Sequence, residues 1–381
     1  MRIAFIGQKG IPAQGGGVER YVEDLSLRLV KLDHEVYVYT RPHYSDPMLT
    51  VHQGVDLISL PSINTKHLDA ISHSILASIH ASFQNFDVIH YQSIGPALVI
   101  WLPKLLNSRV RIVATLQSRD YEHRKWGTFA KFSLKLGERL MCHFADEIIV
   151  VTEGMSRYVQ EHYGRQARFI PNGSNLYSST DSDRLGQFGL TPDNYIVAIS
   201  RLIPHKGLSY LIEAFKQIDS DQKLVIVGEG SFTNGYVNEL HKLAGNDSRI
   251  IFTGLQTGET LAQLYQHSYL FVQPSESEGL SLALLEAMAR SRAVLVSDIP
   301  ENLSAIGQAG FIFANKDSED LKRKLEYLLA NPALTQAKGI EARVRIAEKF
   351  NWDNIAQSIS QLYQTSARQP VSLKQLLFAK K

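Results

Sequence analysis

Short apolar runs alternate with amphipathic stretches from the first residues of the chain onward. Residues 2–7 form an apolar run that ends in glycine, and residues 18–32 then place apolar side chains at helical spacing. Further strands are predicted at 35–40, 55–60, 88–91, 111–116, 147–152 and 168–170. Alternating strands and helices predict a parallel sheet with helices on both faces.

The pattern restarts in the second half of the chain. Asn172-Gly173 and the polar stretch 178–183 indicate a linker. A helix is then predicted at 208–218, and strands at 195–200, 223–227, 250–253, 269–272, 293–297 and 311–313. We therefore expect an α/β protein of two Rossmann-like, doubly wound domains facing across a cleft, because such sheets bind ligands beyond the C-termini of their strands.

The expected domains are residues 1–176 and residues 177–351. Residues 352–381 would form a C-terminal helix that packs back on the first domain, followed by a tail. A chain of 381 residues is too long for one ordinary core, which agrees with two domains.

Composition narrows the class of protein. The chain is 44% hydrophobic and 20% charged, which is typical of a globular protein, and its net charge of +2 argues against a nucleic-acid partner. The single cysteine, Cys142, excludes an internal disulfide framework and fits a reducing compartment. We see neither a signal peptide nor an apolar run long enough to span a bilayer, so we expect a cytoplasmic protein.

Two regions leave membrane contact open. Residues 104–139 hold nine Lys and Arg against three acids, which fits either a solvated face or a site for an anionic acceptor or a membrane surface. The tail at 366–381 mixes apolar and basic residues, which fits either a frayed terminus or a weak anchor at the inner face of the cytoplasmic membrane.

Glycine-rich turns follow two predicted strands. Residues 7–10 and 15–17 lie between the first strand and its helix, so Gly16 and Gly17 could bring backbone amides close to an anion. The spacing matches neither the dinucleotide fingerprint nor a P-loop. Gly228 and Gly230 form a second close-approach turn after the strand at 223–227. A plain surface turn is the alternative for both.

Two cations follow the strand at 195–200. Arg201 and Lys206 lie in the segment SRLIPHKG, and a guanidinium fork with a compact ammonium suits a phosphate or diphosphate. A solvated loop is the alternative interpretation.

The segment SESEGLSLALLEAMA, residues 275–289, places two glutamates eight residues apart. Glu278 precedes a helix predicted over 280–290, where its carboxylate can reach a ligand, and Glu276 is expected to be exposed. Glu286 lies inside the apolar helix, where a buried carboxylate is costly unless it is paired or hydrogen-bonded. A ribose diol would satisfy Glu286, and a salt bridge to an arginine or lysine is the alternative.

Other chemistries find little support in the sequence. Asp181-Ser182-Asp183 lies in the polar linker with no strand before it, and the thirteen histidines lack metal-ligand spacing. There is no Gly-x-Ser-x-Gly motif, and Cys142 falls in a helical stretch, which argues against a nucleophilic hydrolase. We therefore expect no metal and no cofactor.

In this order, these motifs resemble the family 4 retaining glycosyltransferases, which have the GT-B fold. The resemblance covers nearly the whole chain, and its most specific part is the Glu-x7-Glu motif from Glu278 to Glu286, followed by Ala-Met-Ala. It also rests on SRLIPHKG, the glycine-rich loop with Val18-Glu19, the PNG turn at 171–173 and the VGEG turn at 227–230. The first half is similar to a bacterial surface-polysaccharide subgroup, through the segments GQKGIPAQGGGVERYVEDL, LPSINTKHLDAISH and RDYEHRKWG.

The resemblance implies a metal-independent transfer from a nucleotide-sugar donor (UDP-, GDP- or dTDP-sugar) to a saccharide or lipid-linked acceptor. Residues 1–176 would then be the acceptor-side domain and residues 177–351 the nucleotide-sugar-binding domain. Arg201 and Lys206 would neutralise the leaving diphosphate, and Glu278 would face the hydroxyls of the donor sugar. Glu286 would hold the ribose. The remaining implied donor contacts are the backbone amides of Gly279, Leu280 and Ser281 at the helix N-terminus, and Gly16, Gly17, Gly228 and Gly230.

Two positions depart from the family pattern. The family usually has a histidine after the strand at 111–116, where this chain has Gln117, which can contact a sugar or acceptor but cannot titrate near neutral pH. Ser174 and Asn175 follow PNG, where a hydrophobic residue and then Asp are common. Two other functions remain as alternatives: a GT-B-fold sugar-nucleotide epimerase, and a degenerate glycosyltransferase that serves as a binding subunit.

Overall fold

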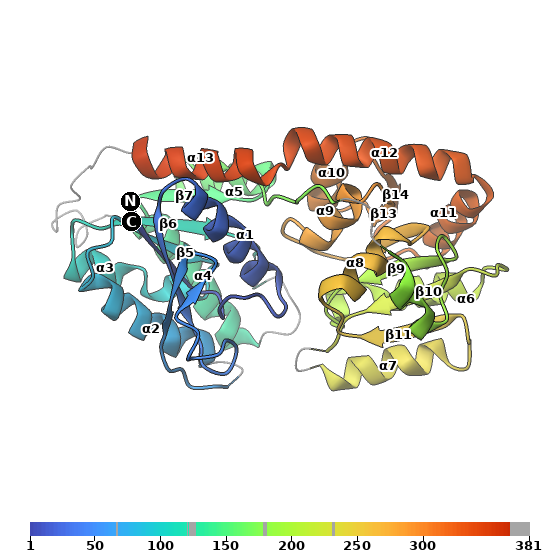
Figure 1. The fold of residues 1–381 in the computed structure, drawn as a ribbon, viewed down its shortest axis with the longest axis horizontal. Coiled ribbons are helices and arrows are strands. Elements are labelled where there is room, and N and C mark those ends of the chain that lie inside the picture. The colour runs from blue at the N-terminus through green and yellow to red at the C-terminus, as the bar shows by residue number, and fades with distance from the viewer. Residues whose placement is uncertain (66–67, 120, 122–126, 178–180, 231–232, 366–381) are drawn as a thin grey trace.

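The computed structural model describes residues 1–65, 68–119, 121, 127–177, 181–230 and 233–365, and it contains two sheets placed side by side (Figure 1). The first sheet has eight strands in the order β3-β4-β2-β1-β5-β6-β7-β8. Its strands are β1 Arg2–Ile6, β2 Glu35–Thr40, β3 Val51–His52, β4 Val55–Ser59, β5 Val88–Gln92, β6 Arg111–Leu116, β7 Glu147–Val150 and β8 Arg168–Phe169. All pairs are parallel except β3 with β4.

The second sheet has six parallel strands in the order β11-β10-β9-β12-β13-β14. They are β9 Tyr195–Ile199, β10 Lys223–Val227, β11 Ile250–Gly254, β12 Leu270–Gln273, β13 Ala293–Ser297 and β14 Phe311–Phe313. In each sheet the strand order reverses next to the first strand of the domain. Ligands bind at such a switch point in open α/β sheets, beyond the carboxyl ends of the strands.

Both faces of the first sheet are covered by helices. Along β1, Ile3 and Phe5 belong to the core under α1 and α13, while Ala4 and Ile6 belong to the core on the opposite face. This burial on both faces explains why the strands are almost continuously apolar. The helices here are α1 Gly17–Lys31, α2 Asp69–Ser82, α3 Trp101–Leu106, α4 Thr128–Phe144, α5 Glu153–Tyr163 and α13 Trp352–Thr365, with the 3₁₀ helix η1 Pro96–Val99.

The second sheet is covered in the same way. Its helices are α6 Leu208–Lys216, α7 Asn234–Ala244, α8 Gly258–Gln266, α9 Leu282–Ala289, α10 Pro300–Ile306, α11 Ser318–Ala330 and α12 Pro332–Lys349, with 3₁₀ helices η3 Asp183–Phe188 and η4 Pro204–Lys206. The helices α6, α7 and α11 pack on one face. The helices α8, α9, α10 and α12 pack on the other, in a core that continues into the first domain.

The chain crosses between the domains twice. After β8 the PNG turn leads to the second sheet, and after α12 the chain returns as α13 along the first domain, as Figure 1 shows in red. The crossings touch: Ser174 forms a bridge with Asn351, and Gly173 packs directly against the ring of Trp352. Trp352 in turn lies against Tyr21 of α1, with 5.5 Å between ring centroids.

The α/β expectation is confirmed, with corrections at element ends. The helix predicted over 280–290 is shorter, Leu282–Ala289, because the Ser281 side chain accepts the amide hydrogen of Leu284 and so begins the helix. Gln273 is part of β12, and the strand ends before Pro274. Within the described residues, no helix is long and apolar enough to cross a membrane. The tail at 366–381 and part of the polar linker, 178–180, lie outside those residues.

Candidate active site

The strand ends of the second sheet bring two predicted loops together. Gly228, just after β10, has a φ of 138°, and a Cβ there would overlap the carbonyl oxygen of Ser200 at the end of β9. A side chain at Gly228 would therefore push the VGEG turn away from the segment that carries Arg201. The amide of Leu202 donates to the carbonyl of Glu229 at 2.8 Å, which fixes the same approach.

Lys206 and Glu278 form an ion pair at this edge of the sheet. The Lys206 ammonium donates to the Glu278 carboxylate, with 2.6 Å between Nζ and Oε1. Both side chains are mostly shielded from solvent, at 14% and 8% exposure, so their attraction is stronger than that of a surface pair. An ammonium has three N–H donors, so the pairing with Glu278 leaves Lys206 two donors for a ligand anion.

A network of polar side chains, which the sequence did not predict, fixes the start of α9 to the ends of β12 and β13. The Ser281 hydroxyl donates to Gln273 at 2.6 Å, and the Gln273 amide donates to Asn302 at 2.7 Å. Asn302 donates to the Ser297 hydroxyl, which donates to the carbonyl of Ser275. The network connects the ends of β12 and β13 to Ser275, in the loop that contains Glu278.

The backbone of residues 279–281 has donors to spare. Among the hydrogen bonds of the described part of the chain, none uses the amide of Gly279, Leu280 or Ser281 as its donor. Amides of this kind at a helix start, together with the helix dipole, favour an anion. The Lys206 ammonium is held by the same loop, through Glu278.

Glu286 lies half-buried in a ring of charges drawn from both domains. Burial raises the pKa of its carboxyl above the ordinary value, and Arg290 and Arg20 offset part of that rise. Burial lowers the pKa of the Arg20 guanidinium, but the carboxylates of Asp24 and Glu286 outweigh burial and raise this pKa above its ordinary value. Because Arg20 belongs to α1, the first domain helps to satisfy a carboxylate of the second.

Aromatic rings complete the surroundings of Glu286. The Tyr265 hydroxyl lies near enough to lower the pKa of the Glu286 carboxyl. The Arg290 guanidinium lies 3.5 Å from the ring centroid of Tyr177 and 5.0 Å from that of Tyr265. The predicted alternative, a salt bridge, is therefore present only as a longer-range attraction: no ion pair of Glu286 within 4 Å is found among the described residues.

The two domains meet at Gly279 and Gln117. A Cβ on Gly279 would overlap the carbonyl oxygen of Gln117, so only glycine allows this approach. The Gln117 side chain is 8% exposed and donates from Nε2 to Oε1 of Gln92 at 3.1 Å. Next to this contact, the Asn172 amide donates to the carbonyl of Leu280 at 3.0 Å, which ties the PNG turn to the second domain.

The glycine-rich loop lies over the start of α9. Gly16 precedes α1, and an atom at the Cβ position of Gly17 would lie 4.0 Å from Leu282 Cδ1. The Tyr44 hydroxyl accepts the amide hydrogens of Gln14 and Gly15 and donates to the carbonyl of Gly15, which holds the loop in place.

Among the described residues, no side-chain hydrogen bond or ion pair joins two of the predicted site residues to the rest of the site. The Arg201 side chain is exposed, and none of the hydrogen bonds or ion pairs of the described residues involves it. A Cβ on Gly230 would lie 2.9 Å from Val237 of α7, so packing against that helix accounts for this glycine.

Glu276 was expected to be exposed, but it is half-buried because Tyr210 and Lys316 both bind its carboxylate.

Most of the missed residues carry no signal in the chain. Gln273 ends a strand, which is a position where ligand-facing groups gather, so it could have been singled out. Asn302, Arg20 and Tyr44 acquire their roles from neighbours that lie far away in sequence, and no spacing marks them.

Metal binding is not indicated within the described residues, which include no cluster of three or more His, Cys, Asp or Glu side chains able to hold an ion. Asp183 instead accepts a hydrogen bond from Gln263 at 2.6 Å, and this bond lowers its pKa.

Cys142 lies in α4, where burial raises the pKa of its thiol to about 12 and removes it as a nucleophile near neutral pH.

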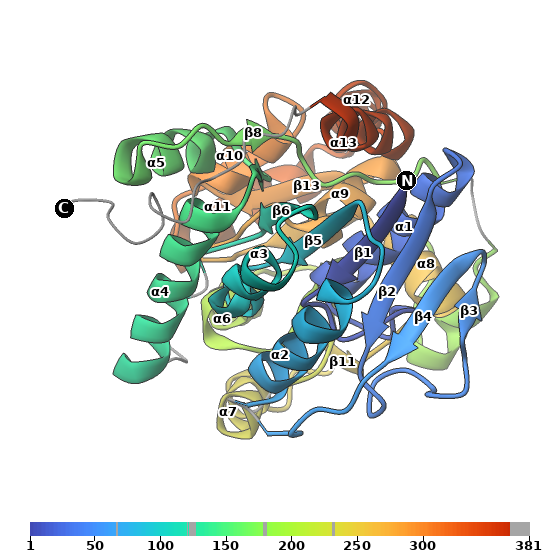
Figure 2. The same cartoon turned by 90° about the vertical axis from the view of Figure 1, so that its left-hand side faces the viewer.

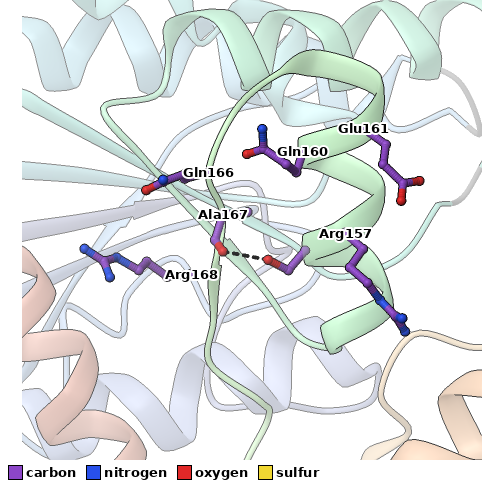
Figure 3. Close-up of a pocket in the computed structure, with 7 residues that line it drawn as sticks. Arg157, Gln160, Glu161, Gln166, Ala167 and Arg168 are labelled. Carbon is purple, nitrogen blue, oxygen red and sulfur yellow. Dashed lines mark hydrogen bonds between the residues drawn. The ribbon is translucent and has the colours of Figure 1, made fainter.

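A separate pocket of about 360 Å³ lies against α5 (Figure 3). Its walls come from α5 and the segment that leads into β8, and the Ser156 hydroxyl donates to the carbonyl of Ala167 at 2.9 Å. It is lined by Ser156, Arg157, Gln160, Glu161, Gln166, Ala167 and Arg168. None of the residues predicted for the active site lines this pocket, so we do not assign the chemistry to it.

Both halves of the chain match known families. The Glycosyltransferase Family 4 model matches residues 15–177, and the Glycosyl transferases group 1 model matches residues 186–349. A glycosyltransferase of Methanocaldococcus jannaschii, itself uncharacterized, is 26% identical over 92% of this chain and 94% of its own length.

Solved structures share the fold over the whole chain. Sucrose-phosphate synthase from Thermosynechococcus elongatus has a TM-score of 0.81 at 24% identity and covers 95% of this chain and 98% of its own. Anabaena Alr3699/HepE, in complex with UDP-glucose, has a TM-score of 0.80 at 20% identity and covers 96% of this chain and 100% of its own. The two α/β domains therefore form the GT-B architecture.

Proposed function

We propose that this chain, which belongs to the glycosyltransferases of family 4 and group 1, transfers a sugar from a nucleotide-sugar donor with retention of configuration. The acceptor would be a saccharide or a lipid-linked saccharide, in the biosynthesis of a surface polysaccharide. One observation carries the proposal. Lys206 forms an ion pair with Glu278 of the loop that precedes α9, and in the described part of the chain the backbone amides of residues 279–281 in this loop donate to no protein acceptor.

The proposed catalysis is electrostatic. As the glycosidic bond of the donor breaks, negative charge develops on the leaving diphosphate and positive charge on the sugar. Lys206 and the amides of residues 279–281 would stabilise the diphosphate, with Arg201 closing from the solvent side. Because the network beneath α9 already fixes these donors, little reorganisation is needed when the charge develops.

The two glutamates would read different parts of the donor. Glu278 would accept hydrogen bonds from the sugar hydroxyls while it orients Lys206. Glu286, half-buried between the domains, would accept from the ribose hydroxyls. The presence of UDP-glucose in the Anabaena protein, which shares the fold, supports a nucleotide-sugar as the donor class.

The first domain would contribute the acceptor side. Gln117 lies at the domain contact, and its amide can hydrogen-bond to a sugar but cannot carry a proton near neutral pH. We therefore propose that the leaving phosphate, and not a protein base, deprotonates the acceptor, with no metal and no cofactor. Gly16 and Gly17 would close over the donor.

The donor is testable without knowledge of the acceptor. Purified protein is screened by thermal shift against UDP-, GDP- and dTDP-sugars, because a ligand that binds only the folded state raises the melting temperature. We expect one nucleotide family to stabilise the protein well above the others. If no nucleotide or nucleotide-sugar shifts the melting temperature, the proposed donor class is wrong.

The role of Glu286 is tested by calorimetry with the nucleotide found in that screen. Glu286→Ala should weaken binding about tenfold or more, because hydrogen bonds to a charged acceptor contribute about 1.5–3 kcal/mol. Glu276→Ala is the matched control, since this carboxylate lies in the same segment but is bound by Tyr210 and Lys316. Unchanged affinity in Glu286→Ala would refute the ribose assignment.

Product analysis separates transfer from the alternatives. The proton NMR spectrum of the product should show the anomeric configuration of the donor. Conversion of one nucleotide-sugar into its epimer without any acceptor would instead indicate an epimerase. Tight donor binding without transfer to any saccharide or lipid-linked acceptor would indicate a binding subunit.

A further inference from the structure

Three helices on one side of the first domain turn apolar side chains toward solvent. On α2, Ile75, Leu76 and Ile79 share one helical face with Phe83, which follows the helix and is 72% exposed. A helix of a globular domain normally turns such a stripe toward the core, so an outward-facing stripe needs an explanation.

The stripe continues over the neighbouring helices. On α4, Phe129 is 83% exposed and Phe132 is 66% exposed, and Leu136 lies one turn further along the same face. Leu105 and Leu106 of α3 are exposed between the two longer helices. Figure 2 shows α2, α3 and α4 together on the side of the first domain that faces the viewer, and α3 contacts both of the others. We call these nine exposed apolar residues, with Lys135 and Arg139, the α2–α4 patch.

The exposed charges on α4 within the patch are positive. Lys135 and Arg139 are exposed on α4, on the flank of the stripe formed by Phe129 and Phe132. Between residues 88 and 144, the only described acid is Glu138, which is fully buried and accepts hydrogen bonds from tyrosine hydroxyls. Two further described acids border the surface: Asp87 follows Phe83, and Asp146 pairs with Lys104 of α3. The patch itself combines aromatic and aliphatic groups with positive charge.

We propose that the α2–α4 patch docks the first domain onto an anionic membrane surface. Protruding phenylalanines can enter the boundary between headgroups and acyl chains, while lysine and arginine remain among the anionic headgroups. Each basic residue near such a surface contributes about 1 kcal/mol. A second copy of the chain is a poorer occupant, because self-association through the patch would bring like charges together.

Docking through this patch would also bring a lipid-linked acceptor close to the active site. The segment between Gln117, at the end of β6, and Thr128, at the start of α4, joins the domain contact to the patch within about ten residues. A lipid-linked acceptor held in the membrane would therefore lie beside the first-domain edge of the site. This consequence rests on the proposed function, whereas membrane docking itself does not.

Vesicle flotation with the full chain tests the docking. The protein is mixed with vesicles of phosphatidylcholine alone or of phosphatidylcholine enriched in phosphatidylglycerol, at low and high salt. We expect it to float with the anionic vesicles, and to be released as salt rises. If the wild-type protein floats with neither, or with both equally at every salt concentration, the proposal is overturned.

Matched variants locate the surface. Lys135→Gln with Arg139→Gln should weaken binding to anionic vesicles about 25-fold, because each basic residue contributes about fivefold. Phe129→Ser with Phe132→Ser should weaken binding to anionic vesicles at every salt concentration at which the wild type still binds. The control is Ile340→Ser with Val344→Ser, which removes two exposed apolar residues from α12 of the second domain and should change nothing.

Donor binding separates this proposal from the proposed function. Each variant is also tested by thermal shift with the nucleotide-sugar, which should stabilise all of them equally, because the patch lies outside the donor site. Loss of flotation with intact donor binding supports the docking. Unchanged flotation in both patch variants overturns it, as does concentration-dependent dimerisation that the phenylalanine variant abolishes.

Discussion

The two sheets end in different chemistry where they meet. The second domain presents charge: Lys206 pairs with Glu278, and Glu286 lies within the helix α9 that follows. Near the meeting point, the first domain contributes the amides of Gln92 and Gln117, a glycine-rich loop, and Arg20 of α1, whose charge offsets that of Glu286. Under the proposed function, the second domain would carry the charges that act on the leaving diphosphate, while the first would supply shape, backbone contact, neutral hydrogen bonds and the counter-charge of Arg20.

The strongest test of this comparison removes charge from the second domain. Lys206→Ala should lower turnover about 100- to 1000-fold, because one preorganised donor at a developing charge contributes about 3–4 kcal/mol to the barrier. Steady-state kinetics with the donor found by thermal shift measures the effect. Lys316→Ala, which removes a cation that pairs with Glu276 nearby, should leave turnover close to wild type. Near-wild-type turnover in Lys206→Ala would refute the proposal that charges of the second domain stabilise the leaving diphosphate.

A second test changes shape in place of charge. Gly279→Ala places a methyl group against the Gln117 carbonyl, so the domains must separate at the site. We expect a loss of stability of up to about 3 kcal/mol, as for an overpacked interior, seen as a lower melting temperature. Gly235→Ala is the control, because nothing lies within 4 Å of its Cβ position on α7. Equal melting temperatures for the two variants would mean that the contact is not tight.

The third test uses pH. The first sheet buries His90 between Tyr363 and Thr115, and burial lowers its pKa to about 3. The unfolded chain binds a proton below its pKa of about 6.5, whereas the folded chain does not, so stability falls as the pH drops from about 6.5 toward 3. Between pH 7 and pH 5 the loss from this residue is about 2 kcal/mol.

Chemical denaturation at these pH values measures the effect. His90→Gln should be less stable than wild type at pH 7 but should lose about 2 kcal/mol less on acidification. His241→Gln is the control, since His241 is exposed on α7. An identical pH dependence in His90→Gln and wild type would show that the first sheet does not hold this imidazole neutral.

The smallest expected effect comes from the loop of the first domain. Tyr44→Phe removes a hydroxyl that accepts two backbone amide hydrogens of the glycine-rich loop, at a cost of about 1 kcal/mol. We expect the KM for the donor to rise about fivefold with little change in kcat, because the loop closes over the donor without touching the developing charge. Tyr327→Phe, at an exposed position on α11, is the control. A fall in kcat alone would place the loop in the chemistry.

Periodicity predicted most of the fold. The strands at 35–40, 111–116, 223–227 and 293–297 occur with the predicted limits, because strands buried on both faces are apolar throughout and end in turn residues. The strand β3 was missed because two residues show no alternation. The helix at α9 was predicted too long because the apolar run does not reveal where the serine side chain begins it.

The site was predictable only as separate pieces. Glu278, Lys206 and Gln117 could be chosen from the sequence, because each lies near a predicted strand or helix end. Their arrangement could not, since 72 residues separate the paired lysine and glutamate. The roles of Arg20 and Asn302 depend on packing between elements and between domains, which no local pattern encodes.

The return of α13 to the first domain has a consequence for engineering. Trp352 and Tyr363 fill the core against α1 and the first sheet, so a fragment that stops at the PNG turn would leave that face bare. Exchange of the second domain between relatives, to alter the donor, therefore requires two junctions, one near residue 174 and one near residue 351, where the crossings already touch. The second domain is in effect an insertion within the first, and chimeras should treat it as one.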